Sequence, residues 1–156
     1  METAYSISLF LHSWNRWIIL IAGIVVLSAA INGYSRKLKY SNFQRIGAIV
    51  FMSSLHLQLL VGLAMYLFLS PITAQALSDF GAAMKEPVLR YWSVEHASVN
   101  FLAICAAQVG SYFVKDRLIA IDKQKHSIIW TSIALVLLLA MIPMGMMGVD
   151  RPWFRF

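Results

Sequence analysis

Residues 91–113, with the sequence YWSVEHASVNFLAICAAQVGSYF, place an acid, an imidazole and an amide in a stretch that is otherwise apolar. These groups are Glu95, His96 and Asn100. A helix of this length can cross the hydrocarbon core of a bilayer. Ionisable side chains are costly in that environment, and they commonly mark functional sites. The stretch therefore predicts a membrane-spanning helix with a candidate site near its beginning.

The composition places the whole chain among integral membrane proteins. Of its 156 residues, 60% are hydrophobic and 13% are charged, whereas soluble domains carry about 45–50% apolar and about 25% charged residues. This length allows one domain over residues 1–156 with a few spans. The single cysteine, Cys105, excludes a disulfide framework. No signal peptide is expected, because the first residues lack a basic region.

Four apolar segments are long enough to span a membrane, and they lie near residues 7–31, 47–69, 91–113 and 128–147. Backbone in lipid must satisfy its own hydrogen bonds, so each segment is expected to be a helix. Short connections make neighbouring helices antiparallel, which predicts an all-α, up-down-up-down four-helix bundle. The longer second connection has apolar residues at helical spacing between Pro71 and Pro87, which predicts a short helix on the membrane surface.

The basic residues predict the orientation of these spans. The first and third connections together hold eight of them, namely Arg36, Lys37, Lys39, Arg45, Lys115, Arg117, Lys123 and Lys125. The opposite side holds four, namely Lys85, Arg90, Arg151 and Arg155. Basic loops stay in the cytoplasm, so both termini are expected on the periplasmic side of a bacterial inner membrane. This topogenic role accounts for the net charge of +6, and nucleic-acid binding is not expected.

Helical spacing predicts which residues face the interior of the bundle. His12 and Arg16 are four residues apart and share a face, which continues through Ile19, Gly23, Val26 and Ala30. His96 begins a second stripe, which continues through Asn100, Ala103, Ala107 and Gly110. Small residues at such spacing let helices, or a flat cofactor, approach closely. The same stripes would also suit the interface of a homodimer.

The depth of each histidine follows from the rise of a helix, about 1.5 Å per residue. On that rise, His12 and His96 each lie roughly 7–10 Å from the outer ends of their spans, whereas His56 lies about 20 Å deep. His126 begins the fourth span on the cytoplasmic side. His12 and His96 are therefore level with each other, His56 is deeper, and His126 is apart.

Two histidines at one depth on different helices suit axial ligation of haem b in an apolar bundle. His12 and His96 are the expected ligands, and His56 is the alternative partner of His96 if the helices tilt or slide. The expected work is one-electron transfer near the outer face, with quinone or a periplasmic redox partner. The chain would then be an electron-transfer cytochrome or an oxidoreductase subunit. One haem near the outer face cannot by itself carry electrons across the bilayer.

Other polar residues are expected to surround such a haem. Its propionates need cationic partners, and Arg16, Arg90 and Lys85 are placed to supply them. Glu95 has two interpretations: it neutralises Arg16, or it accepts the free N–H of a ligating histidine on another helix. It points about 100° away from His96, so it does not serve that ring. Asn100, one turn below His96, is expected to line the pocket.

Two other interpretations remain open from the residues alone. A non-haem copper, zinc or iron site would use His12, His56 and His96, with Glu95 as a further ligand. Alternatively, the polar cluster is structural, and the chain is a non-enzymatic accessory subunit of a larger membrane complex. Hydrolytic chemistry is not expected, because no phosphate loop, activated nucleophile or pair of catalytic carboxylates is visible.

Three blocks of sequence carry a resemblance to a known group. They are residues 12–17, HSWNRW; residues 56–62, HLQLLVG; and residues 84–92, MKEPVLRYW, leading into Glu95 and His96. In this order they resemble small bacterial four-helix membrane proteins of the cytochrome b type. The resemblance implies a haem-b protein of the cytoplasmic membrane. Larger two-haem cytochromes b are also similar but need two level histidine pairs, so only one haem is expected here.

Overall fold

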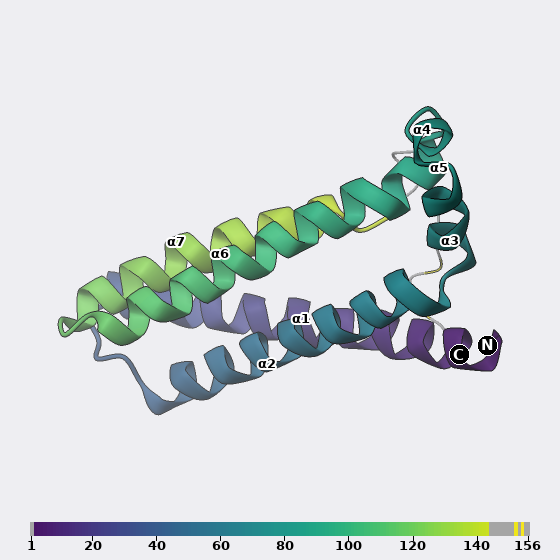
Figure 1. Cartoon of the computed structure of the whole chain (residues 1–156). Coiled ribbons are helices and arrows are strands. Elements are labelled where there is room, and N and C mark those ends of the chain that lie inside the picture. The colour runs from purple at the N-terminus through teal and green to yellow at the C-terminus, as the bar shows by residue number, and fades with distance from the viewer. Residues whose placement is uncertain (1, 144–151, 153, 155–156) are drawn as a thin grey trace.

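The computed structural model describes residues 2–143 together with Pro152 and Phe154. This described part is helical and contains no strand, which confirms the all-α prediction. Four long helices make up most of it: α1 (Glu2–Ser35), α2 (Asn42–Ala64), α6 (His96–Asp116) and α7 (Ala120–Ala140). Successive long helices run in opposite directions (Figure 1).

Shorter elements join α2 to α6. They are a π-helical turn η1 (Met65–Leu69), the helices α3 (Pro71–Ser78), α4 (Phe80–Ala83) and α5 (Pro87–Arg90), and a second π-helical turn η2 (Tyr91–Glu95). The single surface helix expected between Pro71 and Pro87 is thus divided into α3 and α4. The division falls at Asp79, whose carboxylate accepts a hydrogen bond of 3.0 Å from the backbone N–H of Ala82 and begins a new helix there.

Three continuous helical stretches in the described chain are long and apolar enough to cross a membrane: Glu2–Ser35, Asn42–Leu69 and Pro87–Asp116. Each of them extends beyond the apolar segment that predicted it. The fourth predicted span, residues 128–147, is not among them. Helix α7 begins at Ala120, its first turns carry charged residues, and residues 144–147 lie outside the described part of the chain. The described structure is therefore compatible with a multi-span membrane protein.

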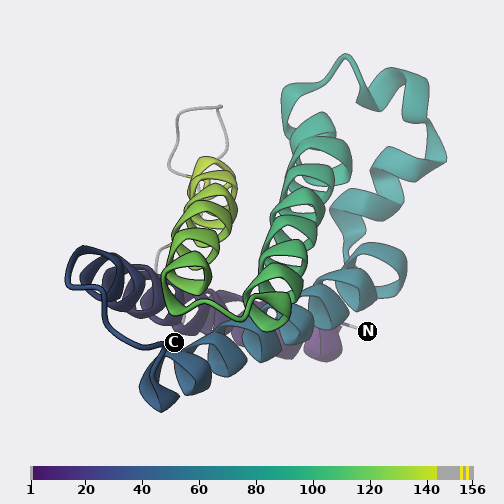
Figure 2. The same cartoon turned by 90° about the vertical axis from the view of Figure 1, so that its left-hand side faces the viewer.

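The long helices pack as two pairs. Helix α1 packs along α2, helix α6 packs along α7, and α1 also contacts α7 closely, whereas α2 and α6 touch little (Figures 1 and 2). Small residues permit the close contacts: a Cβ atom added to Gly23 would lie 2.7 Å from Cδ2 of Leu135. The two stripes predicted to face the interior are buried at Ile19, Gly23, Val26, Ala30, Ala103, Ala107 and Gly110.

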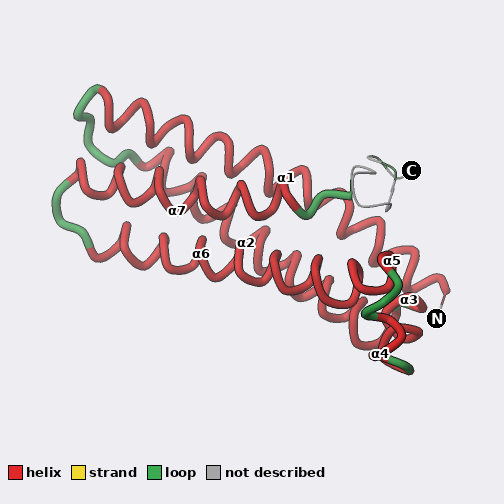
Figure 3. The backbone as a smooth tube through the Cα atoms, turned by 90° about the horizontal axis from the view of Figure 1, so that it is seen from above, coloured by secondary structure: helices red, strands yellow, loops and turns green. Residues whose placement is uncertain are grey.

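The two ends of the molecule differ in construction. Figure 3 shows the α1–α2 and α6–α7 connections at one end, called here the basic-loop end, and α3, α4 and α5 at the other, called the α3–α5 end. At the basic-loop end, Gln124 of α7 is fully buried. Its Oε1 accepts a hydrogen bond of 2.6 Å from Nε2 of Gln44, and its own Nε2 donates to Oε1 of Gln44 at 3.3 Å. This pair of amides joins the start of α2 to the start of α7.

We expect Gln124→Ala to lower the free energy of unfolding by about 1–3 kcal/mol, because Nε2 of the buried Gln44 would lose its acceptor. Thermal unfolding of the detergent-solubilised protein measures the change as a lower midpoint. Gln108→Ala is the matched control, because Gln108 is exposed on α6. Equal midpoints for the two variants would contradict this role of the amide pair.

Candidate functional site

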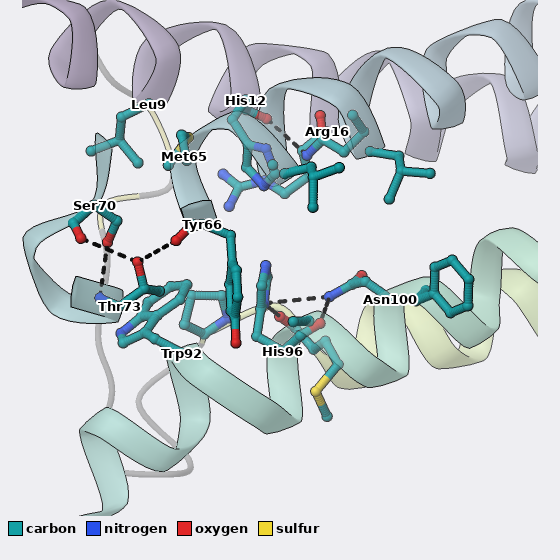
Figure 4. A pocket seen from close by; sticks show the side chains of 18 of the residues that line it. Leu9, His12, Arg16, Met65, Tyr66, Ser70, Thr73, Trp92, His96 and Asn100 are labelled. Carbon is teal, nitrogen blue, oxygen red and sulfur yellow. Dashed lines mark hydrogen bonds between the residues drawn. The ribbon is translucent and has the colours of Figure 1, made fainter. Parts of the chain in front are cut away.

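A cavity of about 580 Å³ lies between the two helix pairs, towards the α3–α5 end. Its walls come from α1, α2, η1, α3, α4, η2, α6 and α7, and most of the lining is apolar. This volume is within the range of about 300–1,000 Å³ that is typical of small-molecule and cofactor sites. The cavity brings together residues that are far apart in the sequence (Figure 4).

His12 of α1 and His96 of α6 line opposite walls of this cavity and point towards each other (Figure 4). Their ring centres are 6.3 Å apart, and the ring planes are inclined by 51°. A metal ion bound on opposite sides by two imidazole nitrogens, at about 2.0–2.1 Å from each, needs ring centres roughly 6 Å apart. The two histidines lie level with each other, as the depths predicted from the helical rise indicated. The distance between their rings suits one metal atom between them.

A backbone carbonyl orients His96. Its Nδ1 lies 3.2 Å from the carbonyl oxygen of Met141, the residue directly after α7. A carbonyl can only accept, so Nδ1 carries the proton and Nε2 keeps its lone pair. The amide Nδ2 of Asn100 also lies 3.4 Å from this Nδ1, but it makes a shorter bond of 2.7 Å to the carbonyl of His96. Histidine ligands of metals commonly have such an N–H to carbonyl bond.

His12 is held differently. Its Nδ1 is buried and has no hydrogen-bond partner within the described part of the chain. Buried polar atoms are normally bonded, so an orphaned ring nitrogen beside a cavity favours a ligand there. Gly62 of α2 leaves room for the ring: a Cβ atom at that position would lie 3.3 Å from Cε1 of His12.

Amide side chains fix the backbone around His12. Asn15 donates through Nδ2 to the carbonyl of Ser54 and to Oε1 of Gln58, both at 2.8 Å. Gln58 in turn donates through Nε2 to the carbonyl of His12 at 3.0 Å. These bonds connect α1 and α2 at the level of the site. The sequence shows that Asn15 and Gln58 are polar, but it does not indicate which groups on the other helix they bond.

The two π-helical turns both line the cavity and contact each other. The hydroxyl of Tyr66 in η1 donates to the carbonyl of Ser93 in η2 at 2.9 Å. The hydroxyl of Thr73 in α3 donates to the carbonyl of Tyr66 at 2.9 Å. Such turns interrupt α-helices and occur often at functional sites. No feature of the sequence indicated them.

Glu95 and Arg90 lie outside the cavity lining. Oε1 of Glu95 lies 2.7 Å from Nε of Arg90, and Arg90 also donates to the carbonyl of Met84 at 3.3 Å. The expected bond from Glu95 to a histidine or to Arg16 is replaced by this ion pair. The reason is proximity, because Arg90 at the end of α5 lies beside Glu95 of η2. The separate bond from Arg90 to the carbonyl of Met84, which directly follows α4, joins α5 to α4.

Of the other predicted residues, Arg16 and Asn100 line the cavity, whereas His56 does not. His56 is exposed on the outer face of α2, because its neighbour Leu55 points into the core and is fully buried. Successive helical residues point about 100° apart, so the two cannot share a face. Among the described residues, no group of three histidine, cysteine, aspartate or glutamate side chains is placed to hold a metal ion. The three-histidine arrangement is therefore not formed.

Comparisons with protein-family models, with curated proteins and with solved structures each find no match to this chain. The resemblance to cytochrome-b-type membrane proteins therefore stays an expectation. What the protein does must be inferred from the geometry of its own residues.

Asn15→Ala should loosen the contact between α1 and α2 beside His12, because Gln58 and the Ser54 carbonyl would each lose a buried partner. We expect a loss of about 1–3 kcal/mol in the free energy of unfolding, measured as a lower thermal midpoint. Asn32→Ala, at an exposed position of the same helix, is the control. An Asn15→Ala variant as stable as Asn32→Ala would argue against the role of this contact.

Proposed function

We propose that this protein binds one haem b between His12 and His96 in a bacterial cytoplasmic membrane and transfers single electrons. The observation that carries the proposal is the facing pair of histidines across an apolar cavity, with ring centres 6.3 Å apart. The two histidines come from α1 and α6, on opposite walls of the cavity. Histidine ligation from facing helices is a recurring way to hold haem in a helical bundle.

The surroundings of the pair fit a large flat group. The cavity of about 580 Å³ has a mostly apolar lining, and Gly62 keeps the wall beside His12 free of a side chain. When bound, haem supplies a one-electron couple whose potential depends on its ligands and its burial. The chain contributes the two imidazoles, the carbonyl of Met141 that orients His96, and apolar walls that exclude water.

Arg16 is the proposed partner of a propionate. It lines the cavity one turn from His12 (Figure 4), and its guanidinium also lies 5.5 Å from the ring centre of Trp17. A guanidinium forms charge-assisted hydrogen bonds with a carboxylate. Arg90 and Lys85 were further candidates from the sequence, but neither lines the cavity. The proposal for propionate binding therefore narrows to Arg16.

The proposed setting is a four-span bundle with the basic-loop end in the cytoplasm and both termini on the periplasmic side. The cavity would then lie near the outer face. Its lining includes Leu63 of α2 and Phe101 of α6, which are 48% and 53% exposed, where these two helices touch little. An opening between apolar helices favours a membrane-soluble quinone as the exchange partner. A periplasmic redox protein or another subunit of a respiratory complex is the alternative.

The purified protein should be red, with a Soret band that shifts on reduction with dithionite. His12→Ala and His96→Ala should each abolish the low-spin spectrum, because each removes one of the two side chains that would hold the haem. His56→Ala is the matched control and should keep the spectrum, since His56 is exposed away from the cavity.

A colourless preparation from cells supplied with haem would overturn the proposal. Metal analysis of that preparation would then separate the two other interpretations. A bound copper, zinc or iron ion would favour a non-haem metal protein, and its absence would favour an accessory subunit with a structural polar cluster.

Arg16→Gln should shift the reduction potential of the haem to a more negative value. Loss of a positive charge near the haem removes a Coulombic interaction that favours the reduced form, and such interactions are strong in a low-dielectric interior. Arg45→Gln is the control, because Arg45 is exposed near the start of α2, at the basic-loop end. The assignment of Arg16 to a propionate fails if the reduction potential of the Arg16→Gln protein equals that of the Arg45→Gln protein. Redox titration followed at the Soret band gives both values.

A further inference from the structure

The carbonyl oxygen of Met141 accepts hydrogen bonds from two donors at the start of the third span. The hydroxyl of Tyr91 donates to it at 2.8 Å, and Nδ1 of His96 lies 3.2 Å from it. The last carbonyls of a helix have no partner within that helix, and Met141 directly follows α7. The end of α7 therefore supplies one acceptor that a tyrosine and a candidate ligand share.

The π-helical turn η2 makes this sharing possible. In a regular α-helix, two residues five positions apart point about 140° away from each other. Here the backbone N–H of His96 bonds to the carbonyl of Tyr91, five residues earlier. This wider turn brings both side chains to the same side of the helix, with ring centres 5.7 Å apart. Tyr91 and His96 can therefore reach a single carbonyl.

Tyr91 is held firmly in this position. Its side chain is 2% exposed and belongs to a small apolar cluster with Met141, Trp92 and Val99. The ring of Trp92 meets it edge-on, with ring centres 4.9 Å apart. The hydroxyl is thus directed at the Met141 carbonyl by packing as well as by its own hydrogen bond.

We infer that Tyr91 is a positioning residue that sets the electron-donating strength of His96 by sharing the Met141 carbonyl with it. The inference rests on the proposed function, in which His96 is an axial ligand. A hydrogen bond from the free N–H of a ligating imidazole raises the basicity of that ligand. The bond from Tyr91 to the Met141 oxygen is shorter than the bond from His96 to the same oxygen. Because both donors share one acceptor, the tyrosine weakens the hydrogen bond from His96. His96 is thereby kept a weaker donor to the metal than the carbonyl alone would make it.

Tyr91→Phe tests the inference, because phenylalanine keeps the ring and removes only the hydroxyl. The Met141 carbonyl would then serve His96 alone, and the stronger imidazole donor would stabilise the oxidised haem. We expect a retained low-spin spectrum and a more negative reduction potential. We expect the equilibrium constant of haem reduction to change roughly threefold to tenfold, which is the effect of about one net hydrogen bond. A tenfold change corresponds to a shift of about 59 mV in the potential of a one-electron couple.

Tyr112→Phe is the matched control, since Tyr112 is exposed on the same helix α6. A Tyr91→Phe protein whose potential equals that of the control, or is more positive, overturns the inference while leaving haem binding intact. A wild-type protein without haem would overturn the proposed function and this inference together.

A second measurement on the wild-type protein covers the case in which Tyr91→Phe fails to retain haem. Ring-deuterated tyrosine should shift a band in the infrared difference spectrum between oxidised and reduced protein, because the Tyr91 hydrogen bond responds to the state of His96. A difference spectrum without any tyrosine band would overturn the inference.

Discussion

Hydrogen bonds between polar groups of different helices set the arrangement of this otherwise apolar protein. A buried polar group without a partner is costly in an apolar interior, and dispersion between aliphatic side chains has little directional preference. The amides of Gln44 and Gln124 join α2 to α7 at one end, and those of Asn15 and Gln58 join α1 to α2 beside the cavity. The Met141 carbonyl joins the end of α7 to η2 and the start of α6. These three contacts add directional preference to the packing of the apolar helices.

The same requirement connects the fold with the candidate site. The end of α7 leaves the Met141 carbonyl without a partner in its own helix, and His96 fills that position with Nδ1. This hydrogen bond fixes the tautomer of the His96 ring and leaves its Nε2 available to bind a metal ion. The contact that satisfies the end of one helix therefore also orients the candidate ligand His96 on another. His12 lies on the opposite wall of the cavity, and its buried Nδ1 has no hydrogen-bond partner within the described chain.

The cavity exists because the two helix pairs touch closely along only one side. Helix α1 packs against both α2 and α7, whereas α2 and α6 touch little. The elements between α2 and α6 bridge this gap at the α3–α5 end, where Tyr66 and Ser93 connect the two π-helical turns. The space between the helix pairs and the exposed apolar residues at its edge, Leu63 and Phe101, thus have a common structural origin. This arrangement supports the proposal of a haem that exchanges electrons with a quinone.

The sequence alone determined the helical class, most of the apolar segments, the buried stripes on α1 and α6, and the level placement of His12 and His96. These features depend on spacing along one chain segment, which the helical repeat and rise convert into position. The tertiary structure alone decided that His56 faces outward, that Glu95 pairs with Arg90, and that Tyr91 shares a carbonyl with His96. Those outcomes depend on how each helix is rotated against its neighbours and on one π-helical turn. Local periodicity carries no signal for either, because a single residue inserted into a helix turns every later side chain by about 100°.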